Sequence, residues 1–231
     1  MDARLDSFDE DAQAIGTLDI ATIKVPGQPQ GLYLRHGKRL FDIALVLLFA
    51  PVVIPVIFTL AVVVWLDGGA PFFKQIRVGR GGRSFAMLKL RTMRTDAERA
   101  LTELLLNDPA AALEWRLHQK LSVDPRITNV GRFLRRSSLD ELPQLWNVLR
   151  GDMSLVGPRP MLENQTDLYP GTAYFRVRPG LTGPWQVFAR NLNGFADRAK
   201  FDTAYAADVG FFRDLTLIFC TFGAVLRGTG Q

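Results

Sequence analysis

Residues 43–66 contain no charged side chain and are almost entirely apolar, and this stretch limits the possible folds more than any other part of the chain. As a single helix rising about 1.5 Å per residue, it would be roughly 36 Å long, which is enough to cross a bilayer. The default prediction is therefore a transmembrane helix. A core helix of a soluble protein is a weaker interpretation, because no other part of the chain is apolar enough to enclose it.

Two features favour a re-entrant segment, which enters and leaves the membrane on one face. Pro51 and Pro55 lie in the middle of the stretch, and each removes a backbone donor, so we expect them to break it into a helical hairpin. Basic residues lie on both sides, and the positive-inside rule places both flanks in the cytoplasm. They are Arg35, Lys38 and Arg39 before the stretch and Lys74, Arg77, Arg80 and Arg83 after it. The residues alone leave the re-entrant and spanning forms open.

Charge is distributed unevenly along the 231 residues. Residues 1–30 hold six acidic residues against Arg4 and Lys24, a net charge of −4, so the rest of a chain with +5 overall carries +9. A basic body favours anionic partners such as phosphates, nucleotides or lipid headgroups. We predict a disordered acidic tail at 1–34, the membrane hairpin at 35–70 and a cytoplasmic domain at 71–231.

Few side chains in this sequence bind soft metals. Cys220 is the single cysteine, so the chain forms no intrachain disulfide and has no CxxC site. His36 and His118 are the only histidines, which makes a His/Cys zinc site improbable. We expect any metal to be bound by oxygen ligands, with Mg²⁺ the first candidate.

After the apolar stretch, the patterns predict a small β-hairpin followed by helices. Residues 72–94 hold seven basic residues and no acidic one, and glycines at 79, 81 and 82 divide two strand-like runs. A capping signal at Thr95 begins one helix, and Asp108-Pro109 begins a second that runs to about Leu121. We predict that Leu113, Leu117, Leu121 and Trp115 lie in the core. Apolar and aromatic residues recur on one helical face over 211–226. That helix closes the core or lies on the bilayer interface, and we favour the interface.

Two adjacent carboxylates, Asp140 and Glu141, form the main candidate site. Ser138 and Glu141 have capping-box spacing, which predicts a helix beginning at Leu139, and the first turn of a helix tolerates Pro143. Asp140 would then lie where free N–H groups favour an anion, suited to hold a metal or to attack phosphorus. The alternative is an acidic pair that only stabilises its own helix.

Arg159 is a second candidate, because it lies between Pro158 and Pro160. The two prolines restrict the backbone and place the guanidinium on a rigid loop. A rigid arginine suits planar recognition of a phosphate or a base. An arginine that only packs on an aromatic ring is an equally good interpretation of the spacing.

Six motifs in order resemble the bacterial sugar transferases, the small monotopic phosphoglycosyl transferases. The resemblance covers roughly residues 35–230 and is closest to the short members that serve exopolysaccharide synthesis. The motifs are Arg39-Leu40-Phe41-Asp42, Lys89-Leu90-Arg91-Thr92-Met93, Asp124-Pro125-Arg126-Ile127-Thr128, Ser138-Leu139-Asp140-Glu141-Leu142-Pro143-Gln144, Asp152-Met153-Ser154-Leu155-Val156-Gly157-Pro158-Arg159-Pro160 and Arg178-Pro179-Gly180-Leu181-Thr182-Gly183.

The resemblance implies a fold, a reaction and roles for individual residues. The fold is α+β, with a re-entrant membrane hairpin and a mostly helical cytoplasmic catalytic domain that has a small β-hairpin and amphipathic interfacial helices. The reaction moves hexose-1-phosphate from a UDP-sugar, with galactose or glucose, to undecaprenyl phosphate at the cytoplasmic face of the inner membrane. UMP is released, and a covalent phosphosugar–aspartate forms on Asp140, which also binds Mg²⁺ beside Glu141. The residues that the resemblance implies for phosphate and nucleotide binding are Arg135, Arg159 and Arg190. Lys89 is implied to lie near the reacting groups.

Two departures from the family pattern concern the hairpin and the donor loop. The family's hairpin commonly breaks at Ser-Pro, whereas Pro51 and Pro55 here follow alanine and isoleucine. The turn before Arg190 lacks the family's glycine. The main alternative function is a non-catalytic basic scaffold at the membrane surface. No nucleic-acid motif is present, so nucleic-acid binding is disfavoured, and the oligomeric state, a homodimer included, is left open.

Overall fold

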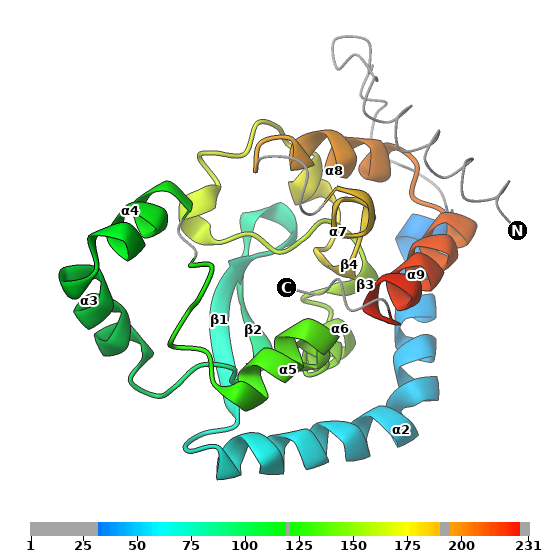
Figure 1. The fold of residues 1–231 in the computed structure, drawn as a ribbon. Coiled ribbons are helices and arrows are strands. Elements are labelled where there is room, and N and C mark those ends of the chain that lie inside the picture. Colours follow the sequence, from blue (N-terminus) through cyan, green and yellow to red (C-terminus); the bar gives the residue numbers. More distant parts are fainter. Residues whose placement is uncertain (1–31, 119–120, 190–194, 227–231) are drawn as a thin grey trace, which may run out of the picture. The chain divides into compact units, whose positions relative to one another are not determined.

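The computed structural model describes residues 32–118, 121–189 and 195–226, so nearly all of the predicted acidic tail lies outside the described residues. The described chain is mostly helical, as predicted, and it has two small sheets, of which only the β1–β2 hairpin was predicted (Figure 1). Its elements in order are η2 (Tyr33–Gly37), α2 (Lys38–Leu66), β1 (Phe72–Val78), η3 (Arg80–Gly82), β2 (Ser84–Leu90), α3 (Ala97–Asn107), α4 (Pro109–His118), α5 (Asn129–Ser137), η4 (Leu139–Glu141), α6 (Gln144–Arg150), β3 (Ser154–Val156), η5 (Glu163–Gln165), η6 (Ala173–Arg176), β4 (Gly180–Thr182), α7 (Pro184–Phe188), α8 (Arg198–Ala207) and α9 (Phe211–Leu226).

Contacts within the chain define two compact units, and the boundary between them passes inside α2, β1 and β2, after the first residue of α6 and before the end of α9. The first unit holds the start of α2, the middle of the β1–β2 hairpin and the elements from α6 to α9. The second holds the rest of α2, the base of the hairpin and the elements from α3 to η4. Their ranges are Met1–Leu48, Ile76–Met87 and Leu145–Gly223 for the first, and Phe49–Gln75, Leu88–Gln144 and Ala224–Gln231 for the second.

The apolar stretch forms one long helix. The helical segment Tyr33–Leu66 is long and apolar enough to cross a membrane, and only 6% of its most apolar window is buried. α2 continues without interruption through Pro51 and Pro55, so the predicted hairpin of two helices is not seen. Each proline removes only one donor from the hydrogen-bond ladder, and the flanking residues keep theirs. Thr59 donates its Oγ1 hydrogen to the carbonyl of Pro55 at 3.0 Å, a contact that often accompanies bending.

In the first unit, buried polar contacts attach the start of α2 to α9 and β3. Lys38 Nζ lies 2.6 Å from Asp214 Oδ2 on α9, and both side chains are almost fully buried. Asp42 accepts hydrogen bonds from Ser154 Oγ at 2.8 Å and from the Leu155 amide at 3.0 Å. Lys38, which the sequence presents as a flanking basic charge, is therefore an internal ion-pair partner. Breaking such a buried pair leaves an uncompensated charge, which is strongly destabilising.

The β3–β4 pair lies in the core of the first unit. The strands are parallel, with Ser154 opposite Gly180 and Val156 opposite Thr182. A Cβ added to Gly180 would lie 2.1 Å from the backbone nitrogen of Gly157, so only glycine allows this close approach. Around the strands, apolar side chains from α2, α6, α8 and α9 form the largest buried cluster; its buried members are Val46, Met87, Val148, Met153, Leu155, Val156, Tyr205 and Leu217.

The helix predicted over 211–226 is present as α9. It is amphipathic, because Asp214 and Leu217 are buried, whereas aromatic side chains on the remaining face are exposed; these are Phe212, Phe219 and Phe222. The exposed aromatic face agrees with a helix that meets an apolar phase, and its placement on a bilayer stays a prediction.

In the second unit, a short core joins α2, β2 and α5. Val64, Leu90 and Leu134 are its buried members. The predicted β-hairpin is confirmed. α4 begins at Pro109 as predicted, and the Asp108 carboxylate accepts hydrogen bonds from the amides of Ala110 and Ala111. The core assignment of Leu113 is wrong, because its side chain is 56% exposed. α4 lies at the surface, so periodicity there does not mark a core-facing stripe.

Candidate active site

The backbone around the acidic pair is a corner between two helices. α5 ends at Ser137, and Ser138 adopts a left-handed conformation with φ 56°. The predicted helix beginning at Leu139 is wrong: residues 139–141 form one 3₁₀ turn, and α6 begins at Gln144. Ser138 makes no side-chain cap bond. Pro143 explains the difference, because a helix starting at Leu139 would place a residue without an N–H beyond its first turn.

The corner brings the carboxylates to Lys89 on β2. Lys89 Nζ lies 2.7 Å from Glu141 Oε1 and 4.0 Å from Asp140 Oδ2. The lysine and both acids are largely shielded from solvent, so their interaction is screened less than a surface ion pair. Sequence reasoning placed Lys89 near the reacting groups, and among the described residues Lys89 is the cation that forms ion pairs with both acids.

Asp140 is buried, with 8% of its surface exposed. Burial raises its pKa to about 6, and the adjacent Glu141 charge acts in the same direction, while Lys89 and Arg135 oppose the rise. At pH 7 most of the carboxylate is therefore ionised, although it has lost part of its hydration. A desolvated carboxylate beside one fixed cation is suited to act as a nucleophile or as a ligand of a metal ion.

Arg135 lies in the last turn of α5 and is held by Thr92, two residues after the end of β2. Its Nε donates to Thr92 Oγ1 at 2.9 Å, and Thr92 is buried. α5 reaches this position because Gly131 lies against the Thr92 carbonyl, where an added Cβ would come within 1.9 Å. Burial lowers the pKa of Arg135, while the charges of Asp140 and Asp124 oppose that change. The guanidinium stays cationic, and one of its nitrogens is committed to Thr92.

The second unit thus assembles Lys89, Arg135, Asp140 and Glu141 into one site. Arg159 belongs to the first unit, on the segment after β3, where its side chain is half-buried and its carbonyl accepts a hydrogen bond from Arg198. Arg190 lies outside the described residues.

Similarity to known proteins identifies the family of the chain. The family profile described as bacterial sugar transferase matches residues 33–228, nearly the whole described chain. The chain belongs to this family. The match includes the strand that carries Lys89, the corner that carries Asp140 and Glu141, and the Arg159 segment.

Three relatives illustrate the range of similarity. The chain is 45% identical over 198 residues to the UDP-galactose-lipid carrier transferase of Erwinia amylovora, covering 85% of this chain and 42% of that protein. It is 45% identical over 201 residues to the exopolysaccharide production protein ExoY of Rhizobium meliloti, covering 84% and 88%. It is 35% identical over 239 residues to the UDP-glucose:undecaprenyl-phosphate glucose-1-phosphate transferase of Caulobacter vibrioides, covering 93% and 83%. The chain therefore spans less than half of the Erwinia protein but most of the other two.

The acidic pair of this sugar transferase fits a Mg²⁺ ion that takes only one or two of its ligands from the protein. Among the described residues, no three His, Cys, Asp or Glu side chains come together as a metal cluster. Magnesium in phosphate-transferring sites often uses only one or two carboxylates, with substrate phosphates and water completing its six ligands. The neighbouring carboxylates of Asp140 and Glu141 supply that smaller set of oxygens.

Sequence reasoning missed two residues that support the candidate site. Thr92 holds Arg135, and its place in the Lys89–Met93 motif was the available signal. Arg198 holds the Arg159 carbonyl. Its position at the start of an ordinary helical segment gave no indication of burial, because arginines are mostly exposed.

Proposed function

We propose that the protein transfers hexose-1-phosphate from a UDP-sugar to undecaprenyl phosphate and releases UMP, as the first step of building an exopolysaccharide repeat unit. Family membership and the names of the relatives support this reaction: one names a UDP-galactose-lipid carrier, another UDP-glucose with undecaprenyl phosphate, and a third exopolysaccharide production. Galactose and glucose are both named, so the choice of sugar is left to experiment.

The Lys89–Asp140–Glu141 contact is the observation that supports the chemistry best. In the first step, an Asp140 oxygen attacks the sugar-linked phosphorus, an O–P bond forms and the diphosphate bond breaks. UMP leaves with the bonding electron pair. In the second step, an oxygen of undecaprenyl phosphate attacks the same phosphorus, and the Asp140 carboxylate leaves. The products are UMP and undecaprenyl diphosphate-sugar, and the enzyme is regenerated.

The neighbouring residues make this attack feasible in different ways. Lys89 reduces the repulsion between the Asp140 carboxylate and the negatively charged diphosphate, an electrostatic contribution that is large when water is excluded. Glu141 holds the Lys89 ammonium in place at 2.7 Å. Arg135, with Thr92 fixing one of its nitrogens, presents its remaining N–H groups to a phosphate. Arg159 binds the nucleotide from a loop whose backbone is held on both sides.

Mg²⁺ completes this proposal as a cofactor held by Asp140 and Glu141. When bound, it would neutralise charge on the diphosphate and on the departing UMP. The protein residues keep their assignments beside it: Asp140 attacks, Lys89 and Arg135 hold phosphate oxygens, and Glu141 orients the lysine and the metal.

Transfer to a lipid places the enzyme at the membrane, and we propose that α2 enters the bilayer re-entrantly from the cytoplasmic face of the inner membrane. Basic residues before and after the helix favour this topology over a span. Labelling in intact cells tests it, with single cysteines at Gln30 and Gly68 in a Cys220→Ser background. Both positions should resist impermeant reagents added outside. Labelling of only one of them from outside would establish a span.

Purified full-length protein tests the reaction directly. We expect Mg²⁺-dependent release of UMP from UDP-galactose or UDP-glucose only when undecaprenyl phosphate is present. A radiolabelled sugar-phosphate should become attached to the protein when the acceptor is withheld. Asp140→Asn should lower turnover at least about a thousandfold and abolish the attached label, because it removes the nucleophile.

Asp96→Asn is the matched control, since Asp96 is an exposed aspartate whose carboxylate contacts Arg94; its turnover should stay near that of the native protein. Retained turnover in Asp140→Asn would refute the assigned nucleophile. Absence of turnover with every UDP-sugar, combined with retained liposome binding, would favour a non-catalytic membrane scaffold.

A further inference from the structure

The segment that carries Arg159 is held by its backbone at consecutive positions. The Arg159 carbonyl accepts a hydrogen bond from Arg198 Nη2 on α8. The next carbonyl, of Pro160, accepts one from Arg77 Nη1 on β1 at 3.1 Å. Two guanidinium groups from different elements therefore fix the peptide units on either side of the Pro160 ring. Such charge-assisted bonds are stronger than bonds between neutral groups.

The following residue, Met161, is fixed as well. Its amide donates to the Tyr174 hydroxyl at 3.3 Å, and its carbonyl accepts from the Val78 amide at 3.0 Å. The Tyr174 hydroxyl donates in turn to the Val78 carbonyl. The backbone at Arg159, Pro160 and Met161 is thus held by the protein, whereas no described residue forms a hydrogen bond or ion pair with the Arg159 guanidinium. That guanidinium is available to a ligand.

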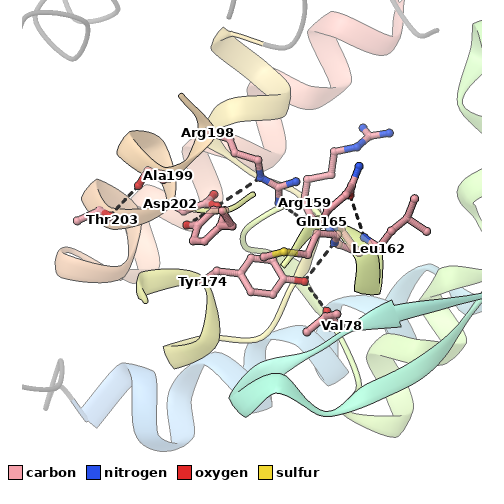
Figure 2. A network of polar contacts seen from close by, with 12 residues as sticks. Val78, Arg159, Leu162, Gln165, Tyr174, Arg198, Ala199, Asp202 and Thr203 are labelled. Atoms are coloured by element: carbon pink, nitrogen blue, oxygen red, sulfur yellow. Dashed lines mark hydrogen bonds and ion pairs between the residues drawn. The ribbon is translucent and has the colours of Figure 1, made fainter. Parts of the chain in front are cut away.

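Arg198 is an unusual group to find holding a loop, because its side chain is only 3% exposed. Its guanidinium carbon lies between 5.1 and 5.9 Å from the centres of four aromatic rings; these belong to Phe195, Tyr174, Tyr169 and Trp185. Asp202 lies one turn later on α8, and its Oδ2 is 3.6 Å from Arg198 Nε. The same carboxylate accepts a hydrogen bond from the Tyr169 hydroxyl at 3.0 Å. Figure 2 shows Arg198 meeting the Arg159 backbone, with Asp202 and Tyr174 beside them.

Burying the Arg198 guanidinium costs free energy, and packing alone does not explain why an arginine occupies this position. A guanidinium loses its hydration on burial, and apolar side chains of similar volume often fill such a space with equal or better stability. Here Arg198 provides something an apolar residue lacks, a long rigid donor that reaches the Arg159 carbonyl from α8. The aromatic rings and Asp202 limit the directions its planar group can take.

We propose that Arg198 is a positioning residue for donor binding: by holding the Arg159 carbonyl, it sets the direction in which the Arg159 side chain leaves the loop to meet the nucleotide. The inference rests on the proposed function, in which Arg159 binds the UMP part of the donor. Arg198 acts through Arg159 and does not itself touch the donor.

A double-mutant cycle between Arg159→Ala and Arg198→Met tests this, with full-length protein in detergent. Three quantities are measured for each variant: the KM and kcat for the UDP-sugar, and the Kd of UMP by calorimetry, which does not depend on turnover. We expect Arg198→Met to raise both KM and Kd roughly tenfold with a small change in kcat, as for a lost charged hydrogen bond. Arg159→Ala should do the same, and the double variant should be no weaker than Arg159→Ala.

Arg198→Lys and Lys200→Met complete the set. Lysine keeps the charge but not the planar group, so it should recover part of the UMP affinity, and it replaces methionine in the cycle if Arg198→Met does not fold. Lys200 is an exposed residue on the same helix, paired with Asp197 at 3.2 Å, and Lys200→Met should leave UMP affinity and melting temperature near native.

The outcomes separate the two proposals. Independent losses, in which Arg198→Met weakens UMP binding by the same factor with or without Arg159, would overturn the positioning role and leave the proposed function intact. A fall in kcat with unchanged KM and Kd would overturn it as well, because it would indicate a merely structural residue. Native UMP affinity in Arg159→Ala would refute the nucleotide role of Arg159 and this inference with it.

Discussion

The acidic corner in one unit and the Arg159 segment in the other fix their charged groups by different means. At the corner, side chains hold side chains: Lys89 contacts both carboxylates, and Thr92 holds Arg135. At the Arg159 segment, side chains hold the backbone, and no described residue forms a hydrogen bond or ion pair with the Arg159 guanidinium.

The difference follows from what each site has to do in the proposed reaction. A nucleophile needs a controlled charge, so its partners act on the carboxylate directly and keep it ionised in a desolvated place. A binding arginine needs a fixed direction and free N–H groups, so its partners act on the loop and leave the guanidinium available. Electrostatic changes should therefore affect turnover at the corner and affinity or stability at the segment.

After loss of the nucleophile itself, the largest effect is expected where the cation is removed at the corner. Lys89→Met leaves the Asp140 and Glu141 carboxylates beside each other without their shared cation, and the incoming diphosphate adds further negative charge. We expect UMP release to fall about a hundredfold, as when one fixed stabilising group is removed from an active site. Lys74→Met is the matched control, an exposed lysine on β1, and it should keep near-native turnover. Similar losses in both variants would show that general basicity matters and the corner does not.

A smaller effect is expected from disturbing the support of the corner without touching a charge. In Gly131→Ala, the new Cβ would meet the Thr92 carbonyl at 1.9 Å, so α5 must move away from the segment that follows β2. We expect a loss of about 2 kcal/mol in stability, visible as a lower melting temperature in detergent. Turnover should fall too, because the Arg135–Thr92 contact lengthens.

Gly210→Ala serves as the control for Gly131→Ala, since an added Cβ at Gly210 meets nothing within 4 Å. It should melt within a degree or two of the native protein. Equal melting temperatures for Gly131→Ala and the native protein would show that α5 and β2 can separate without cost, and would remove the packing argument for the position of Arg135.

The elements that could be predicted from the sequence are those with strong local signals. The apolar stretch of α2, the glycine-divided hairpin, the Asp108-Pro109 helix start and the aromatic periodicity of α9 each depend on near neighbours along the chain. The corner at Ser138 could not be predicted from the capping-box spacing. The same residues are compatible with a helix start and with a helix that ends on a residue in the left-handed conformation. Pro143 disfavours a helix start at Leu139, and the packing of α5 against Thr92, through Gly131, also selects the second.

The candidate site shows the same division. Asp140, Glu141, Lys89 and Arg135 could be named from their motifs, and the structure brings them together. The supports could not be named, because a buried arginine such as Arg198 has no local signature. Its role depends on aromatic residues and on a loop about 40 residues earlier, which the fold alone brings into contact.

The smallest effect is expected from titration of Asp202, near the Arg159 segment, and it should appear in the stability of the protein. Burial raises the pKa of Asp202 to about 6, above the usual value of 3.8, while Arg198 opposes the rise. Because the folded state then binds a proton more readily than the unfolded state, the penalty for the charged carboxylate is present above pH 6 and is relieved as the pH falls toward 4. Relative to Asp202→Asn, which has no such titration, the native protein should gain about 1 kcal/mol of stability between pH 7 and pH 5. Melting temperatures of both proteins across this range measure the difference. A native protein that instead loses stability relative to Asp202→Asn on acidification would show that the Arg198 ion pair outweighs burial, and Asp202 would then be an electrostatic anchor like the residues of the corner.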